Sequence, residues 1–438
     1  MRIALVGVAA AAAATISLFG GVFAHGSSPA GSAATRPVTP SEPLADRRGG
    51  AGDSTTTLVT KLQARARANP RDALALTQLG LAYQQRARET ADPSYYPRSE
   101  GILRKALALG PRNALAISGL GSLALARHRF REALVLGRRA AALDPGEARH
   151  QGVIGDALVE LGRYSAAFGA FDRMSALEPA ASSYARISYA RELLGHPAAA
   201  IAPMRLAVEA SGAEPEGHAW ARVQLGKLYW SVGRIGAAGK QYRHALGTFP
   251  GYVHALDALA QVEAARGHLG SAIGLERRAV DTVPLPQFVG TLGDLLRTGG
   301  HPALARQEYA LVDIERRLLR ANGVKTDLEI ALFEVDHGVR LRRALALARR
   351  GRRDRPSIDG DDVLAWALAR NGRCGEALRY SERALRLGTR DALKYFHRGM
   401  IERCLGRRPQ ARTWLRRALA LNPHFTVLWA PVARREAK

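Results

Sequence analysis

The chain has 438 residues, a formal net charge of +25 and two cysteines. The charge predicts attraction to nucleic acid, anionic lipid or acidic polymers, and length alone would predict about three domains. The spacing of the two cysteines matches neither a CxxC motif nor a zinc site, which argues against a catalytic or metal-binding pair.

The first residues differ in composition from the rest of the chain. Met1 and Arg2 precede an uncharged apolar run, residues 3–24, with small residues at its last and third-last places. These are the three parts of a secretory signal peptide, although the run is also about long enough for an uncleaved membrane anchor. No cysteine lies near residue 24, which excludes a lipoprotein anchor.

Residues 25–55 are rich in Gly, Ser, Ala and Pro, and this composition predicts a flexible linker. We therefore expect residues 1–24 to be a signal peptide or N-terminal anchor. We expect the remainder to work outside the cytoplasm, either secreted or held at the cell envelope.

From residue 56 onward, small residues and prolines recur at a fixed interval. Pro111, Pro145 and Pro179 are 34 residues apart, and Pro250 and Pro284 repeat that spacing. Glycines and alanines keep the same interval, among them Gly121, Gly155, Gly226, Gly293, Gly399, Ala133, Ala167, Ala238, Ala377 and Ala411. Small residues let two helix backbones approach closely and proline ends a helix, so each unit predicts two antiparallel helices. Such units stack in a row and need no single large core, so the repeat overrides the estimate from length.

The clearest unit runs from Trp220 to Pro250. It has Leu225, Gly226, Tyr229, Ala238, Tyr242, Ala245 and Pro250 at the places of a W-LG-Y-A-F-A-P pattern. In this pattern the chain resembles the tetratricopeptide repeat (TPR) family over about residues 56–423. The resemblance implies an all-α, right-handed superhelical solenoid of antiparallel helix pairs. It also implies a non-enzymatic scaffold that binds a protein or peptide partner through its concave face.

The repeat divides the chain unevenly. We expect a main TPR array over residues 56–317, a degenerate repeat or connector over 318–357, a C-terminal TPR pair over 358–423 and a C-terminal cap over 424–438. The first full unit carries an insertion at residues 89–97 that contains Tyr95 and Tyr96. Insertions of this kind form loops on one face and are often where binding occurs. The alternative is that the two tyrosines pack the loop onto the solenoid.

The family resemblance also indicates where a binding groove would lie. In TPR proteins the first helix of each pair lines the concave surface, and helical periodicity groups the side chains of one face. The groove candidates are Tyr189, Trp220, Lys227, Trp230, His254 and Asp257. Exposed aromatic rings beside a few charges are typical of peptide anchors, whereas the alternative is that the rings fill gaps between units. Some family members hold a peptide's terminal carboxylate with Lys, Asn and Arg, but the matching positions here are Thr77, Leu81, Ser118 and Ser122.

The repeat frame brings the two cysteines into neighbouring helices. Cys374 falls at the start of a second helix and Cys404 near the end of the next first helix. Antiparallel stacking places a helix start beside a helix end, so we expect a disulfide, as an exported protein would permit. The alternative is two separate buried thiols.

The remaining sequence shows no catalytic constellation, no metal-ligand grouping and no cofactor motif, so we expect neither enzyme activity nor a cofactor. Asp336 and His337 form an adjacent acid and imidazole pair, which we interpret as a loop or helix-end contact and not as a metal site. Arginines are frequent on the second helices and over residues 340–355. They support an alternative function, an envelope-surface protein that docks on anionic lipid or polymer through its outer face. Nucleic acid is not expected as a partner, because no recognition motif accompanies the arginines.

Overall fold

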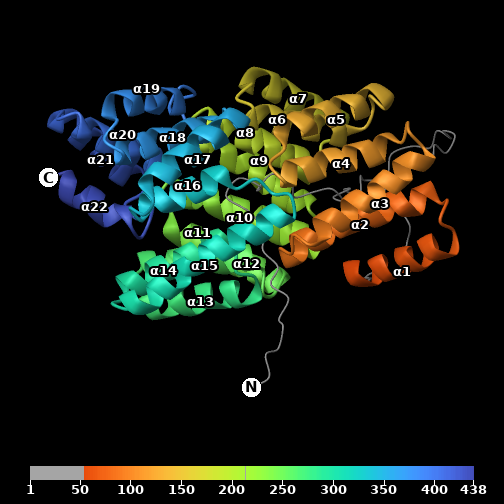
Figure 1. The fold of residues 1–438 in the computed structure, drawn as a ribbon, viewed down its shortest axis with the longest axis horizontal. Coiled ribbons are helices and arrows are strands. Elements are labelled where there is room, and N and C mark those ends of the chain that lie inside the picture. Colours follow the sequence, from red (N-terminus) through yellow and green to blue (C-terminus); the bar gives the residue numbers. More distant parts are fainter. Residues whose placement is uncertain (1–53, 213) are drawn as a thin grey trace.

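The computed structural model describes residues 54–212 and 214–438, and within them the chain forms helices and no strands. Consecutive helices pack as antiparallel pairs into a right-handed all-α solenoid, as predicted (Figure 1). The predictions for residues 1–24 and for the linker before residue 54 lie outside the described residues. None of the described helices is both long enough and apolar enough to span a membrane.

In chain order, the first ten helices are α1 (Thr55–Ala68), α2 (Ala73–Thr90), α3 (Tyr95–Leu109), α4 (Ala114–Ala126), α5 (Phe130–Leu143), α6 (Ala148–Glu160), α7 (Tyr164–Leu177), α8 (Ala181–Leu193), α9 (Pro197–Ala210) and α10 (Pro215–Ser231). Those that follow are α11 (Ile235–Thr248), α12 (Val253–Ala265), α13 (Leu269–Thr282), α14 (Pro286–Thr298), α15 (Pro302–Ala321), α16 (Asp327–Asp336), α17 (Leu341–Asp354), α18 (Ile358–Arg370), α19 (Cys374–Ala384), α20 (Ala392–Cys404), α21 (Arg408–Leu421) and α22 (Trp429–Glu436).

The pair α10 and α11 shows why the small residues recur. A Cβ atom on Gly226 in α10 would overlap the ring of Tyr242 in α11, so only glycine lets that ring lie against the helix backbone. Gly233 between the two helices has a φ of +75°, a left-handed conformation that glycine adopts without a steric penalty. In this unit a glycine turn joins the two helices, and the helices pack over a small residue. In the turns after α2 and α4 the left-handed residue is instead Ala91 and His128.

The insertion in the first unit is not a loop, and that prediction was wrong. Helix α2 continues to Thr90, and α3 already begins at Tyr95. The short link is a tight turn in which the carboxylate of Asp92 accepts hydrogen bonds from the backbone N–H (2.8 Å) and the hydroxyl (2.9 Å) of Ser94. The inserted residues therefore lengthen the two helices instead of forming a protrusion.

The degenerate segment also forms a helix pair, α16 and α17, of which α16 has only 10 residues. Three of the six arginines on α17 are bonded to carboxylates. Arg343 bonds to Asp313 (3.1 Å), Arg350 to Asp327 (2.6 Å), and Arg352 to Asp361 (2.9 Å). The bonds of Arg343 and Arg352 join neighbouring units, whereas the bond of Arg350 lies within the α16 and α17 pair.

The superhelix closes on itself, which the sequence analysis did not predict. Asn422 Nδ2 donates to the carbonyl of Trp230 (2.8 Å) across 192 residues, and the Ile358 N–H donates to Tyr164 Oη (2.7 Å) across 194. Thr389 Oγ1 donates to the carbonyl of Leu193 across 196 residues. One superhelical turn thus takes about 195 residues, and the later helices lie directly beside α6 to α10 (Figure 1). The two turns of the superhelix are therefore in direct contact along this seam.

The predicted disulfide is confirmed. Cys374 opens α19 and Cys404 ends α20, and the two are bonded with their Cα atoms 5.9 Å apart. After α21, the short helix α22 places the ring of Trp429 against that of Phe396, with 5.3 Å between the ring centroids. This segment covers the last helix pair of the array.

Candidate functional site

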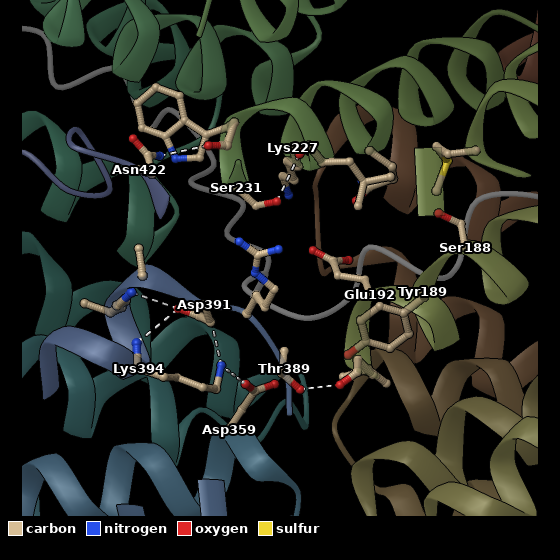
Figure 2. Close-up of a pocket in the computed structure, with 18 of the residues that line it drawn as sticks. Ser188, Tyr189, Glu192, Lys227, Ser231, Asp359, Thr389, Asp391, Lys394 and Asn422 are labelled. Carbon is tan, nitrogen blue, oxygen red and sulfur yellow. Dashed lines mark hydrogen bonds and ion pairs between the residues drawn. The ribbon is translucent and has the colours of Figure 1, made fainter. Parts of the chain in front are cut away.

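A cavity of about 340 Å³ lies between the two turns of the superhelix. Helices α8 and α10 form one wall, while the start of α18, residues 389–394 and the segment after α21 form the other (Figure 2). Its lining includes Ser188, Tyr189, Glu192, Met204, Trp220, Gln224, Lys227, Trp230, Ser231, Asp359, Thr389, Arg390, Asp391, Lys394, Asn422 and Phe425. We call this space the inner cavity.

The aromatic groove candidates meet at this cavity. Tyr189 comes from α8, whereas Trp220 and Trp230 come from α10, nearly three turns apart on that helix. Trp220 is only 7% exposed and belongs to the core between units, while Tyr189 and Trp230 are half-buried. The rings therefore fill gaps between helices and line the cavity at the same time, so the two alternatives from the sequence are not exclusive.

The α8 and α10 wall carries an acid and a base. Lys227 is exposed to the cavity, but the surrounding protein desolvates its ammonium and lowers its pKa, against the attraction of Asp257 and Glu192. Burial raises the pKa of Glu192 to about 7; Asp391 acts in the same direction, and Lys394 and Lys227 act against it. Near neutral pH, Glu192 can therefore accept or donate a proton in a hydrogen bond to a ligand.

The opposite wall is set by Lys394. Its ammonium bonds to Asp359 (2.8 Å) and Asp391 (2.7 Å), as Figure 2 shows. Burial acts to lower the pKa of Lys394, but the three carboxylates of Asp359, Asp391 and Asp362 outweigh it and hold that pKa well above its ordinary value. Arg390 also lines the cavity, is exposed to it, and makes no ion pair with any residue that the structure describes.

The other predicted groove residues lie one unit further along. His254 and Asp257 belong to α12 and are half-buried, and neither borders the inner cavity. The ring of His254 packs edge-on against Tyr252 and Phe288, and its burial lowers its pKa to about 3. Burial raises the pKa of Asp257 to about 6, against the attraction of Lys227. The structure therefore brings four of the six groove candidates to one cavity.

Tyr95 and Tyr96 do not line this cavity. Tyr95 packs within its own unit, and Tyr96 contacts the next one. The ring of Tyr95 lies 5.9 Å from that of Tyr83, and Tyr96 is buried beneath the guanidinium of Arg127. Burial raises the pKa of the Tyr96 hydroxyl to about 12. This matches the alternative in which the two tyrosines pack the segment onto the solenoid.

The second-turn lining residues were missed in the sequence analysis. Arg390, Asp391 and Lys394 reach the cavity only because the superhelix closes, and no local signal links them to α10. Asp391 is an ordinary helix N-cap that accepts from the N–H of Leu393 (2.8 Å) and of Lys394 (3.1 Å). A cap followed three residues later by lysine predicts a helix start, not a binding wall.

A second hollow of about 400 Å³ adjoins the first and shares Asp359, Leu393 and Lys394 with it. We call it the acidic compartment; it is lined by parts of α14, α16 and α18. Across the described parts of the chain, no group of three or more His, Cys, Asp and Glu side chains is placed to hold a metal ion.

Two stretches of the sequence, residues 223–285 and 363–424, match the family model described as Tetratricopeptide repeat. The match covers units on both turns of the superhelix, including α10, α11, α12 and α18 to α21. These regions are TPR units, in agreement with the resemblance seen in the sequence. No curated protein matches the chain.

Several solved structures are similar in fold. Human IFIT1, solved as a dimer with PPP-AAAA, is 15% identical, with 84% of this chain and 87% of that one covered at a TM-score of 0.45. PilW, a type IV pilus biogenesis factor, is 18% identical, and the match covers 48% of this chain and 97% of that one at a TM-score of 0.38. YrrB, a TPR protein with an unusual peptide-binding site, is 20% identical, and the match covers 42% of this chain and 92% of that one at a TM-score of 0.28.

Proposed function

We propose that this chain is a non-enzymatic TPR scaffold that binds an extended segment of a partner protein inside its superhelix. The observation that carries the proposal is the inner cavity, where Tyr189, Trp220 and Trp230 converge with ionisable groups from both turns. Its volume of about 340 Å³ accommodates side chains and a stretch of backbone, and a cavity with apolar walls and a few polar groups is the usual form of a ligand site.

The lining suits a polypeptide better than a small apolar molecule. The rings offer rigid apolar surface for an anchor side chain. Gln224 offers an amide group that could pair with peptide N–H and C=O groups. Arg390 and Lys227 offer positive charge for a carboxylate on the partner.

The proposal is tested by selecting binders from a random peptide library against the full chain and measuring their affinity by fluorescence anisotropy. Replacing Trp230 by alanine should weaken the binding of a selected peptide at least tenfold, because Trp230 lines the cavity and is only half-buried. Trp414→Ala is the matched control: Trp414 lies on α21 beneath Arg398 and Arg417, away from the cavity lining. No binders, or equal losses in both variants, would refute the proposal.

We further infer that the chain works outside the cytoplasm, either secreted or anchored at the envelope. The disulfide between Cys374 and Cys404 supports this, because such bonds persist in oxidising compartments. The apolar run before residue 25 supports it independently. N-terminal sequencing of the protein recovered from its source should give a chain that begins near His25 if the run is cleaved. A chain that begins at Met1 in the membrane fraction would indicate an anchor, and one in the cytosol would contradict export.

A further inference from the structure

The acidic compartment differs in charge from the rest of this basic chain. Its lining contains five carboxylates, namely Asp294, Glu329, Asp336, Asp359 and Asp362, but only two strongly basic groups, Arg355 and Lys394. Both bases are already shared, since Arg355 bonds to Glu160 and Lys394 to Asp391 outside the lining. A chain with a net charge of +25 thus encloses a hollow with an excess of negative charge.

Asp336 is the carboxylate with the least compensation. Its Oδ1 atom accepts hydrogen bonds from the indole N–H of Trp366 (2.8 Å) and of Trp429 (3.0 Å). Both donors are neutral, and Oδ2 receives no hydrogen bond from the residues that the structure describes. The indoles therefore fix the carboxylate in place, and Asp336 lines the compartment with its Oδ2 without a hydrogen-bond donor from the described residues.

Asp294 is held in a similar way but is paired with a cation. Its Oδ1 accepts from Tyr309 Oη (2.7 Å) and from His337 Nε2 (2.8 Å). The other imidazole nitrogen, Nδ1, lies 2.7 Å from the carbonyl of Phe333. Because a carboxylate and a carbonyl can only accept, both ring nitrogens donate and His337 is an imidazolium. Asp294 is thereby neutralised. Asp336 forms no ion pair among the described residues, and only the nearby imidazoles of His397 and His337 attract its charge.

An independent sign of a missing partner comes from Asp362. This residue is only 6% exposed and lines the same compartment. Its Oδ2 bonds to His397 Nδ1 (2.9 Å), but its buried Oδ1 has no hydrogen-bond partner among the described residues. A buried carboxylate oxygen without a partner is costly in a folded protein, and a cationic donor in the compartment would relieve that cost.

We propose that the acidic compartment receives a lysine or arginine side chain of the bound segment, with its charged head at Asp336. This inference rests on the proposed function, since it names the chemistry of one partner side chain. The shared wall at Asp359, Leu393 and Lys394 lets one segment reach both hollows. An organic cation is favoured over a metal ion, because no metal-binding group is placed within the described residues.

The test uses peptides selected from the random library against the full chain. Selected peptides should share one basic residue, and replacing it by norleucine should weaken binding to the unchanged protein at least tenfold. In the Asp336→Asn protein, the remaining side-chain oxygen can still accept hydrogen bonds from both indoles. Replacing the peptide's basic residue by norleucine should weaken its binding to this variant by no more than about twofold. Asp281→Asn, at an exposed position on α13, makes the same change in net charge and should retain the full loss.

The outcomes separate the two claims. A library that yields no binder refutes the proposed function, and the inference falls with it. The cation site is refuted, while the proposed function stands, if the norleucine peptides bind as tightly as the originals. It is also refuted if the norleucine replacement lowers affinity equally for Asp336→Asn and for the unchanged protein. Asp362→Asn provides a second variant, with a smaller but similar reduction expected, should Asp336→Asn fail to give a folded protein by circular dichroism.

Discussion

Arg355 fastens the second turn of the superhelix to the first, and its removal should open that seam. The residue follows α17 and is only 5% exposed. Its guanidinium contacts both carboxylate oxygens of Glu160 at the end of α6, across 195 residues, and also bonds to Glu329 (3.3 Å). Burial raises the pKa of Glu160 to about 7, against the attraction of Arg355, so this carboxylate depends on its cation to remain charged.

The magnitude follows from burial. Replacing Arg355 by methionine leaves Glu160 buried without a cation, and breaking a buried ion pair in this way costs about 3–5 kcal/mol. Arg350 is the matched control: its side chain is 52% exposed and bonds to Asp327 within the α16 and α17 pair. An exposed pair contributes only about 0–1 kcal/mol, so Arg350→Met should change the free energy of unfolding little.

Urea unfolding of both variants measures the difference, and hydrogen exchange locates it. Arg355→Met should speed exchange at residues 160–164 and 356–358, where Ile358 N–H donates to Tyr164. Adding Glu160→Met should restore most of the lost stability, since an apolar pair removes the uncompensated charge. If Arg355→Met costs no more than Arg350→Met and exchange at the seam is unchanged, the two turns are not held together as described.

Three further changes test other parts of the structure. Replacing Cys374 and Cys404 by serine should lower the free energy of unfolding by about 3.5 kcal/mol in the loop-entropy model, because the bond joins positions 30 residues apart. If urea unfolding of the unchanged protein gives the same free energy under reducing and oxidising conditions, the bond does not form. For His337, burial acts to lower the pKa, but the bonds to Asp294 and to a carbonyl raise it overall. Its contribution to stability is therefore complete below the unfolded pKa of about 6.5 and is lost as pH rises through the folded pKa. Urea midpoints compared between about pH 6 and about pH 9 should show this loss in the unchanged protein and not in His337→Gln. Gly226→Ala would push a Cβ into a tyrosine ring of α11 and should cost about 1–3 kcal/mol, whereas Gly274→Ala, in open space on α13, should stabilise by up to about 1 kcal/mol; equal effects on the urea midpoint would contradict the packing described.

The helix pairs could be predicted because each depends on residues close in sequence. Gly226 and Tyr242 are 16 positions apart and meet inside one unit, and the disulfide joins adjacent units, so a repeat pattern contains this information. The insertion at residues 89–97 was misjudged for a local reason. Extra residues between two helices can extend those helices as readily as form a loop, and composition did not distinguish the two.

Closure of the superhelix could not be predicted in the same way. It depends on the small rotation between successive units, added over nearly 200 residues, and no spacing in the sequence reports that sum. The sequence therefore indicated Trp220, Lys227 and Trp230 on α10 but not Arg390 or Lys394, which face them only after a full turn. Asp336 and His337 were noticed as a helix-end contact. Their place beside two indoles and Asp294 arises from helices far apart in the chain.

Site-specific photo-crosslinking tests most directly whether a partner segment enters the superhelix. The photoreactive residue p-benzoylphenylalanine would replace Trp230 at the inner cavity in one full-length protein and Trp414 on α21 in another. With a library-selected peptide present, light should join the peptide to position 230 and not to position 414. Crosslinks at position 414 but not at 230 would place the partner on the outer surface and contradict binding inside the superhelix.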